Sequence, residues 1–329
     1  MEQNVIPKVS VIVPVYNVEP FVERCAHSLF GQTLDSLEYI FVDDCSPDNS
    51  IAIIKQVLDQ YPNRKSQARF LRHEFNQGQA GARTTGMKSA TGEYMIHLDP
   101  DDWVDLDMYE SLYNAAHPAD RLPIDIVCCD YLLHKNQEVY PTSLKVYSTP
   151  NDCLKYLYKP HSSCLFLTNK LVSSSLIKNN NIYPLPGIDF GEDRNMTIRI
   201  FHHANSIVKV PKAFYHYNKD NNNSITRSNP SLELWNKWKK NVDYISEYLL
   251  NLSQSYRITC NYFKFDAKVK FKNLFEDKKE WFYLYRECHK DIIYFSENSL
   301  KSRIILTFIL SNYFIYRLYL LFKQLFKSI

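Results

Sequence analysis

Short β-branched or aromatic runs alternate with stretches of helical periodicity over the first 110 residues. The runs predict four strands: KVSVIVPVYN (8–17), EYIFVDD (38–44), ARFLRH (68–73) and GEYMIHLD (92–99). Apolar residues recur every three to four positions in the stretches between them: EPFVERCAHSLFGQ (19–32), SIAIIKQVLDQY (50–61) and GQAGARTTGMKSA (78–90). This alternation predicts an α/β fold with a mixed, mostly parallel sheet flanked by helices.

The regular alternation ends near residue 120. PIDIVCCDYLLH (123–134) and QEVYPTSLKVYS (137–148) predict an antiparallel pair of strands, GEDRNMTIRIFHHA (191–204) a helix, and SIVKVPKAFYHYN (206–218) a hairpin. Four helical stretches follow Ser231: 232–252, 262–276, 281–295 and 303–326. We therefore expect an α/β domain over residues 1–229 and a helical, basic and aromatic region over 230–329, with a boundary near Asn229.

Charge is divided unevenly along the 329-residue chain. Residues 1–150 hold 12 Lys and Arg against 21 Asp and Glu, whereas the rest hold 27 against 15. The acidic part suits a metal or sugar site, and the basic, aromatic part suits an anionic surface. With 45% hydrophobic and 14% aromatic residues, the composition is that of a globular protein and not of a disordered one.

The eight cysteines form no CxxC pair and no His/Cys cluster at zinc-ligand spacing, so we expect reduced, mostly buried thiols. The N-terminal MEQNVIPKVS has no basic segment followed by an apolar run, and is therefore not typical of a signal peptide. We expect the N-terminal domain to lie in the cytoplasm.

Polar residues follow the end of each of the four predicted strands. In open α/β sheets, ligands bind beyond the carboxyl ends of the strands, so these residues are expected to converge on one crevice. They are Tyr16 and Asn17, then Asp43, Asp44 and Ser46, then Asn76 and Gly78, and finally Asp99, Asp101 and Asp102.

The segment HLDPDDWVD (97–105) places four carboxylates, Asp99, Asp101, Asp102 and Asp105, within seven positions, where like charges repel. Asp102 and Asp105 could equally well belong to a helix N-terminus or to a binding site. A helix N-terminus alone does not explain why all four aspartates are present. The D-x-D spacing suits one hard divalent cation, which uses one or two carboxylates plus substrate phosphates. We expect Asp99 and Asp101 to hold Mg²⁺ or Mn²⁺, and Asp105 to cap the next helix.

Other candidate residues also have ordinary structural explanations. The glycine-rich NQGQAGARTTG (76–86) opens a helix but matches neither a Walker A motif nor GxGxxG after the first strand. Arg83 pairs either with a bound anion or with a surface carboxylate. Asp193, close to the start of a predicted helix, also suits the helix dipole. His216 and Tyr217 are more often strand residues than catalytic ones.

Five motifs in this order, VSVIVPVYN, VDDCSPDNS, NQGQAGARTTG, HLDPDDW and GEDRN, resemble the family 2 glycosyltransferases. The resemblance covers about residues 8–226. It implies the GT-A fold, here with a C-terminal helical extension, and an inverting, metal-dependent enzyme that uses a nucleotide-sugar donor. It does not define the sugar.

The family's roles carry over to matching positions of this chain. The first two strand ends correspond to the pocket for the base and ribose, usually uridine, and the glycine-rich loop lines the nucleotide and sugar. Asp101 matches the acid that coordinates the metal with Asp99, Asp102 lies beside the donor sugar, and Asp193 matches the general base. The implied donor-binding residues are Pro14, Tyr16, Asn17, Asp43, Asp44, Asn76, Gly78, Arg83, Asp99, Asp102 and His216.

Three positions depart from the family pattern. Thr84 stands where the family often has Asn, Pro100 fills the middle of D-x-D, and YHYNKDNNNSIT (215–226) replaces a segment that commonly contains arginine. The last departure leaves open how the leaving diphosphate is capped. The available substitutes are His216, Lys219 and Arg227.

The expected reaction moves a sugar from a UDP-sugar to a hydroxyl of a glycan or lipid-linked acceptor, in surface polysaccharide or glycoconjugate synthesis. One alternative is a non-catalytic protein that binds a nucleotide sugar or glycan, against which the intact Asp99, Asp101 and Asp193 argue. Another is a sugar nucleotidyltransferase, which normally has a glycine-rich, basic loop after the first strand. No nucleic-acid partner is expected, because the basic region has no known reader motif.

The apolar segment 304–322 is interrupted by Ser311, Asn312 and Arg317. A bilayer crossing needs about 20 mostly apolar residues, so we do not expect a complete span. The segment either packs on the helices before it or lies in a membrane interface, and we favour the interface, with the protein peripheral at the inner face of the cell membrane. The basic residues expected near lipid phosphates are Arg303, Arg317, Lys323 and Lys327.

Overall fold

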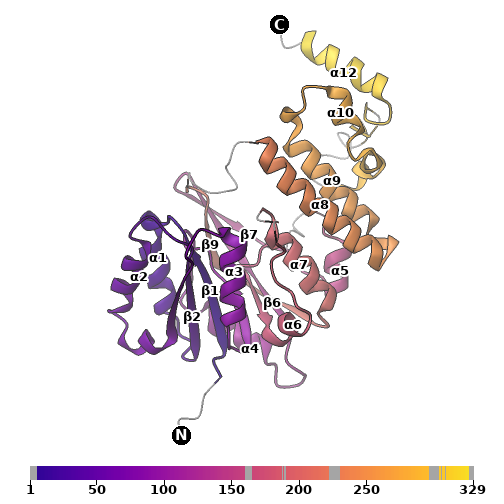
Figure 1. Ribbon diagram of the computed structural model, residues 1–329. Coiled ribbons are helices and arrows are strands. Elements are labelled where there is room, and N and C mark those ends of the chain that lie inside the picture. Colours follow the sequence, from indigo (N-terminus) through magenta and orange to yellow (C-terminus); the bar gives the residue numbers. More distant parts are fainter. Residues whose placement is uncertain are drawn as a thin grey trace. The chain divides into compact units, whose positions relative to one another are not determined.

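The computed structural model describes residues 6–159, 165–186, 188, 190–221, 230–295, 304, 306–307 and 309–325. These residues form two compact units (Figure 1). The N-terminal unit takes the described residues up to Asn151 and those from Leu165 to Asn221, and the C-terminal unit takes Asp152–Lys159 and the residues from Pro230 onward. The expected boundary residue, Asn229, lies outside the described residues.

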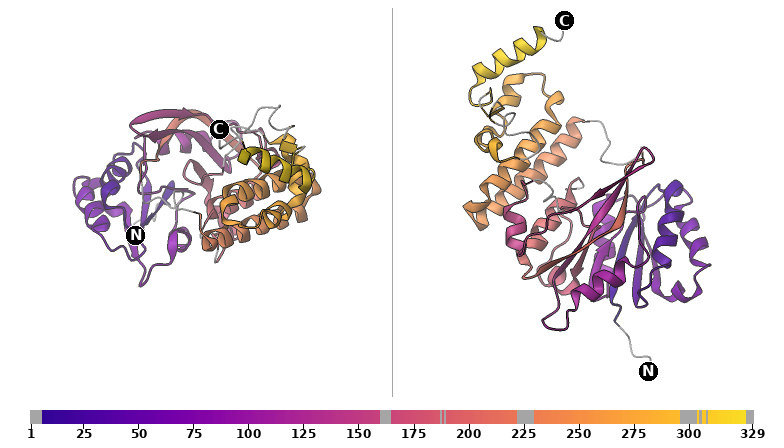
Figure 2. Two further views of the ribbon diagram at one scale, coloured as in Figure 1. Left: turned by 90° about the horizontal axis from the view of Figure 1, so that it is seen from above. Right: turned by 180° about the vertical axis from the view of Figure 1, so that it is seen from behind.

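The described part of the N-terminal unit contains a mixed sheet of nine strands with helices packed against it (Figures 1 and 2). Its order is β3-β2-β1-β4-β8-β6-β9-β5, with β7 paired to β6. The half from β3 to β4 is parallel, whereas β8 is antiparallel to both of its neighbours. The strands are β1 (Val9–Val15), β2 (Leu37–Asp43), β3 (Ala68–Arg72), β4 (Tyr94–His97), β5 (Trp103–Val104), β6 (Ile126–Lys135), β7 (Glu138–Thr142), β8 (Lys170–Ser173) and β9 (Ile207–Asn218).

Helices cover both faces of this sheet, which explains why β1 and β2 are buried along their whole length. Val11 and Val13 belong to one apolar cluster with residues of α1, α2 and α4. Ile12 faces α3, where a Cβ added to Gly86 would lie 2.6 Å from Ile12 Cγ2. The helices of this unit are α1 (Glu19–Phe30), α2 (Ser50–Leu58), α3 (Gly78–Ser89), α4 (Met108–Ala116), α6 (Ser174–Asn179) and α7 (Glu192–His203). Helix α5 (Pro150–Lys155) begins at the end of one stretch of this unit and belongs mostly to the C-terminal unit.

The predicted hairpin over 206–218 is wrong, because β9 is one strand. It runs parallel to β6 and antiparallel to β5. The register passes from Cys129↔Val210 to Asp130↔Ala213, so Pro211 and the residue after it bulge out of the ladder. Proline cannot donate an N–H, and it therefore suits a bulge as well as a turn. The predicted antiparallel pair is confirmed by β6 and β7.

The C-terminal unit is helical in its described residues. Its α-helices are α8 (Leu232–Leu252), α9 (Arg257–Lys270), α10 (Lys278–Tyr283) and α12 (Tyr313–Leu325), and its 3-10 helices are η3 (Gln254–Tyr256), η4 (Lys272–Leu274) and η5 (Arg286–Tyr294). The single helix predicted over 281–295 is wrong, because Tyr285 has a φ of 49° and separates α10 from η5.

A buried lysine joins several segments of the C-terminal unit. Lys268 is 0% exposed, and its ammonium donates to the carbonyls of Phe282 and Leu284 and to Nε2 of His289, each at 2.7 Å. The imidazole Nδ1 of His289 lies 3.0 Å from the carbonyl of Leu310, to which it donates. Burial lowers the pKa of Lys268 to about 8 and that of His289 to about 4.

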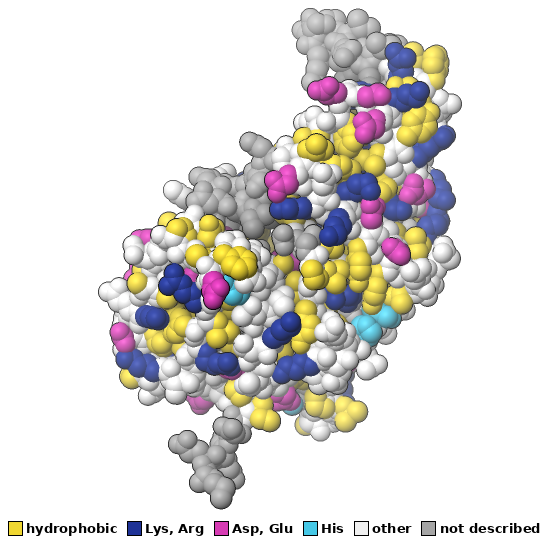
Figure 3. All heavy atoms as spheres, viewed as in Figure 1, with side chains coloured by type: hydrophobic (Ala, Val, Ile, Leu, Met, Phe, Trp, Pro, Cys, Tyr) yellow, Lys and Arg dark blue, Asp and Glu magenta, His cyan; other side chains and the backbone are white. Residues whose placement is uncertain are grey.

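No helix in the described part of the chain is long and apolar enough to cross a membrane. On α12, Tyr316 is buried against Trp281, whereas Phe314, Arg317 and Leu318 are exposed. On the face drawn in Figure 3, Lys and Arg side chains lie among hydrophobic ones. The predicted lipid-facing residues Arg303 and Lys327, and the side chain of Lys323, lie outside the described residues.

The described cysteines are thiols, as expected. Six of them are buried and Cys45 is partly buried. The eighth cysteine, Cys164, lies outside the described residues.

Candidate active site

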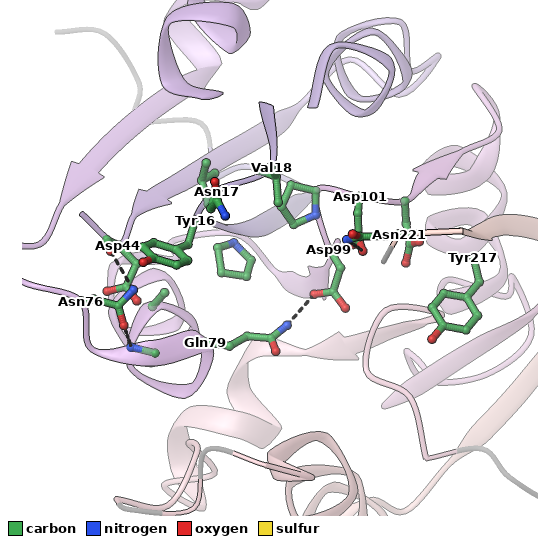
Figure 4. A pocket seen from close by; sticks show the side chains of 16 residues that line it. Tyr16, Asn17, Val18, Asp44, Asn76, Gln79, Asp99, Asp101, Tyr217 and Asn221 are labelled. Carbon is green, nitrogen blue, oxygen red and sulfur yellow. Dashed lines mark hydrogen bonds between the residues drawn. The ribbon is translucent and has the colours of Figure 1, made fainter. Parts of the chain in front are cut away.

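A cavity of about 420 Å³ lies where the carboxyl ends of β1, β2 and β4 meet the start of α3 (Figure 4). The structure brings together here most of the residues that the sequence nominated. Its lining is Pro14, Val15, Tyr16, Asn17, Val18, Asp44, Asn76, Gly78, Gln79, Ala82, Asp99, Pro100, Asp101, Asp102, Tyr217 and Asn221. Four nominated residues, Asp43, Arg83, Asp193 and His216, are not part of this lining.

Asp44 organises one end of the cavity. It is 2% exposed, and its Oδ1 accepts hydrogen bonds from the backbone N–H of Gln77 at 2.8 Å and from Nδ1 of His73 at 2.6 Å. The side-chain amide of Asn76 donates to the backbone carbonyl of Asp44 at 3.2 Å. These bonds fix the loop before α3 against the end of β2.

The turns after β1 and β2 are also bonded to each other. Ser46 Oγ accepts the backbone N–H of Asn17 at 2.9 Å, and Asp43 Oδ1 accepts the backbone N–H of Ser46 at 2.8 Å. Asn17 has a φ of 53° and Cys45 a φ of 61°, both in the left-handed region. Asparagine tolerates this conformation better than most residues. Asp43 does not line the cavity, but it holds Ser46, which in turn holds Asn17 in the cavity wall.

Asp99 already has a positive neighbour within the protein. The guanidinium of Arg83 donates from Nη2 to Asp99 Oδ1 at 2.7 Å and from Nη1 to Glu192. Gln79 Nε2 donates to the same Asp99 oxygen at 3.0 Å. Arg83 is 3% exposed and Glu192 5%, so this arginine is buried between Glu192 and Asp99, and only Asp99 lines the cavity.

Asp101 and Asp102 follow Asp99 in the turn after β4, and all three line the cavity. Asp101 Oδ2 accepts a hydrogen bond from Asn221 Nδ2 at 2.8 Å. Asp102 is 2% exposed and accepts hydrogen bonds from the Tyr215 hydroxyl and, at 2.7 Å, from the backbone N–H of Asn218. Burial, followed by repulsion from neighbouring aspartates, raises the pKa of both carboxyls.

Asp193 lies in the first turn of α7, after Gly191, whose φ of 76° precedes the helix. Its Oδ1 accepts the backbone N–H of Arg194 at 2.7 Å. Burial raises the pKa of Asp193, and it raises that of Glu192 to about 7 although Arg83 opposes the rise. A carboxylate with a raised pKa is a stronger proton acceptor.

His216 belongs to a separate cluster. Its Nε2 lies 2.9 Å from Asp105 Oδ1, its Nδ1 lies 2.9 Å from Nε2 of His134, and its ring stacks on Trp103 with centroids 4.8 Å apart. The predicted helix cap at Asp105 is therefore wrong. Helix α4 instead follows Asp107, which makes no side-chain capping bond. Of the other suggested diphosphate caps, Lys219 follows β9 and Arg227 lies outside the described residues.

Three lining residues whose side chains can form hydrogen bonds are not identified from the sequence: Gln79, Tyr217 and Asn221. Gln79 stands in the glycine-rich turn, and this position was the available signal. The sequence predicts an ordinary strand residue at Tyr217, although strand alternation separates it from His216 and groups it with Tyr215. Nothing in its local sequence distinguishes Asn221 from the asparagines that follow.

The described residues contain no group of three or more His, Cys, Asp and Glu side chains placed to hold a metal ion. Two carboxylates, Asp99 and Asp101, do line the cavity together (Figure 4). Mg²⁺ is usually bound by one or two carboxylates with substrate phosphates completing the set. The residues present therefore fit a cation that arrives with a diphosphate.

Solved structures share this fold. The chain resembles Staphylococcus aureus TarS 1–349 in complex with UDP-GlcNAc, with a TM-score of 0.67 and 21% identity over 86% of this chain and 81% of that one. It also resembles the mannosyltransferase PcManGT of Pyrobaculum calidifontis in complex with GDP-Man and Mn²⁺, with a TM-score of 0.53 and 14% identity over 92% and 79% of the two chains. The fold is of the GT-A type, with a C-terminal helical region.

The family follows from sequence. The profile of Glycosyl transferase family 2 matches residues 10–175. The glycosyltransferase EpsJ of Bacillus subtilis (strain 168) is 33% identical over 227 residues, which are 67% of this chain and 63% of EpsJ. The match therefore spans less than two thirds of that relative's length. The chain belongs to glycosyl transferase family 2.

Proposed function

We propose that this chain transfers a sugar from a UDP-sugar to a hydroxyl group of a glycan or lipid-linked acceptor, with inversion at the anomeric carbon. The observation that carries the proposal is one cavity lined at one end by Tyr16, Asp44 and Asn76 and at the other by Asp99 and Asp101. The first end suits a nucleoside and the second suits a diphosphate with its cation. TarS, a structural neighbour, has been crystallised with UDP-GlcNAc, which supports the choice of a uridine nucleotide.

The proposed metal site consists of two aspartates. Asp101 and Asp99 would hold Mg²⁺ or Mn²⁺ through carboxylate oxygens, and such a cation supplies charge stabilisation for a departing diphosphate. Asn221 orients Asp101 through its amide, and Gln79 and Arg83 orient Asp99. The complex of PcManGT with GDP-Man and Mn²⁺ supports a divalent metal here.

Asp193 is the proposed general base. As a base it accepts the proton of the acceptor hydroxyl while that oxygen attacks the anomeric carbon and the bond to the diphosphate breaks. A single displacement of this kind inverts the anomeric configuration. The raised pKa of Asp193, caused mainly by burial, makes its carboxylate a stronger proton acceptor.

The cellular setting is also a proposal. We place the reaction in surface polysaccharide or glycoconjugate synthesis at the cytoplasmic face of the cell membrane, with the protein peripheral to it. The exposed Phe314 and Leu318 beside Arg317 on α12 support contact with a membrane interface.

A screen of nucleotide sugars with Mn²⁺ tests the function. We expect one UDP-sugar to raise the melting temperature of the full chain in a metal-dependent way and to be hydrolysed slowly to UDP. Binding without hydrolysis or transfer would favour a binding protein instead. Release of pyrophosphate from UTP and a sugar 1-phosphate would favour a nucleotidyltransferase.

A further inference from the structure

Arg83 connects two acids from distant parts of the sequence. Its guanidinium reaches Asp99, after β4, with one nitrogen and Glu192, the first residue of α7, with another. Both partners belong to the N-terminal unit. Arg83 and Glu192 do not line the cavity. Asp99 does line it, and it is bonded to Arg83.

The connection is stiff for physical reasons. The planar guanidinium offers its N–H groups in a fixed fork, so two carboxylates bonded to it are held at a defined separation. Arg83 and Glu192 are both at least nine-tenths buried, which leaves little room for alternative partners. Asp193 follows Glu192 directly in the first turn of α7, so the position of Glu192 sets the position of Asp193.

We infer that Arg83 and Glu192 are positioning residues, whose buried ion pair fixes the first turn of α7, and with it Asp193, relative to Asp99. The inference rests on the proposed function, in which Asp99 lies at the donor and Asp193 serves the acceptor. Glu192 acts through Arg83 and does not contact the donor. Misplacement of a reacting group by about 1 Å is enough to cost about 10²-fold in rate.

Two substitutions of Glu192 separate geometry from charge. In Glu192→Ala the bond to Arg83 is lost, and we expect kcat to fall about 100-fold. In Glu192→Gln the amide oxygen still accepts a hydrogen bond from Arg83, so the loss of kcat should be no more than about tenfold. Calorimetry with UDP and Mn²⁺ should give a Kd within about threefold of the wild type for both variants, because Glu192 does not line the cavity.

Three results would overturn the inference. The first is a kcat for Glu192→Ala above half of the wild-type value, and the second is a kcat for Glu192→Gln as low as that of Glu192→Ala. The third is a loss of UDP affinity that parallels the loss of kcat, since that would place Glu192 at the donor.

A matched variant tests whether loss of stability alone explains the effect. Arg64 is another buried arginine of the N-terminal unit, and its guanidinium donates to the backbone carbonyls of Leu34 and Asp35 at 3.0 and 2.9 Å. Arg64→Met and Arg83→Met both remove a buried cation. We expect both to lower the melting temperature, but only Arg83→Met to lower kcat about 100-fold. An equal loss of kcat in the two variants would overturn the inference.

Failure of the inference is distinguishable from failure of the proposed function. Near-normal transfer by Asp193→Asn would show that Asp193 is not the general base. The proposed function would then fail at this residue, whatever kcat the Glu192 variants have. A large loss of kcat in Asp193→Asn together with a normal kcat in Glu192→Ala would leave the proposed function standing and remove only the positioning role.

Discussion

The side-chain amide of Asn221 donates to Asp101 Oδ2 at 2.8 Å, which joins the end of β9 to the turn after β4 across 120 positions of sequence. Groups that orient a metal-binding carboxylate typically contribute about 10- to 100-fold to metal affinity. We therefore expect Asn221→Ala to raise the Mn²⁺ concentration for half-maximal transfer about tenfold. A titration of activity with Mn²⁺ measures this, and an unchanged midpoint would contradict the role of Asn221.

Asp101→Ala should abolish metal-dependent donor binding. Without this carboxylate the proposed cation loses one of its two protein ligands. Calorimetry with UDP in the presence of Mn²⁺, and again with a chelator, compares the two conditions. The wild type should bind UDP at least about tenfold more weakly when the metal is removed, whereas the variant should show no difference. An unchanged heat of binding in the variant with Mn²⁺ would refute the assignment.

Asp193→Asn should keep UDP binding and lose turnover by about 10² to 10⁴, the usual contribution of a general base. The pH profile provides a second measurement. Burial raises the pKa of Asp193 above its ordinary value of 3.8, so kcat of the wild type should fall as the pH falls through that raised value. A variant that transfers sugar at a near-normal rate would exclude Asp193 as the base.

Gly86→Ala should destabilise the N-terminal unit. The new methyl group would lie 2.6 Å from Ile12 Cγ2 and 3.4 Å from Val42 Cγ2, so α3 would have to move away from the sheet. Overpacking of this kind costs about 1 to 3 kcal/mol of unfolding free energy. Denaturant unfolding measures the change. A stability equal to that of the wild type would show that α3 moves at no cost.

Lys268→Met should destabilise the C-terminal unit by about 1 to 3 kcal/mol, because the carbonyls of Phe282 and Leu284 lose their buried donor. The pH dependence has a defined sign. Burial lowers the folded-state pKa of Lys268 to about 8 from its ordinary 10.5. At a pH between these two pKa values, the protein therefore takes up a proton when it unfolds. The free energy of unfolding should therefore rise as pH increases through this window in the wild type. Lys268→Met should lack that contribution. If the free energy of unfolding changed equally with pH in the two proteins, Lys268 would not be the group responsible.

The parallel half of the sheet could be predicted from sequence because β1, β2 and β4 are buried along their whole length and helical segments separate the strands. Val9–Val15 and Leu37–Asp43 are apolar runs of this kind. The polar residues after them could be assigned to the cavity because parallel strands end at one edge. In β9, Pro211 misled the prediction, since the sequence does not show whether a proline ends a strand or bulges from it.

The partners of the acidic residues could not be predicted in the same way. The Arg83–Glu192 pair spans 109 positions, and both residues also suit ordinary helix surfaces. Repulsion among the clustered aspartates indicated a missing positive charge, for which we expected a metal. The structure adds a protein cation, Arg83, beside Asp99. Asn221 comes from a polar stretch without periodicity, so its contact with Asp101 depends on the path of β9.

β4 has parallel β1 on one edge and antiparallel β8 on the other. Of the cavity lining, Tyr217 and Asn221 come from the sequence after β8, and every other residue comes from the first 102 positions. In the proposed reaction, donor recognition therefore rests mainly on the first 102 positions, and Tyr217 and Asn221 complete it from the part of the chain that follows Asp193.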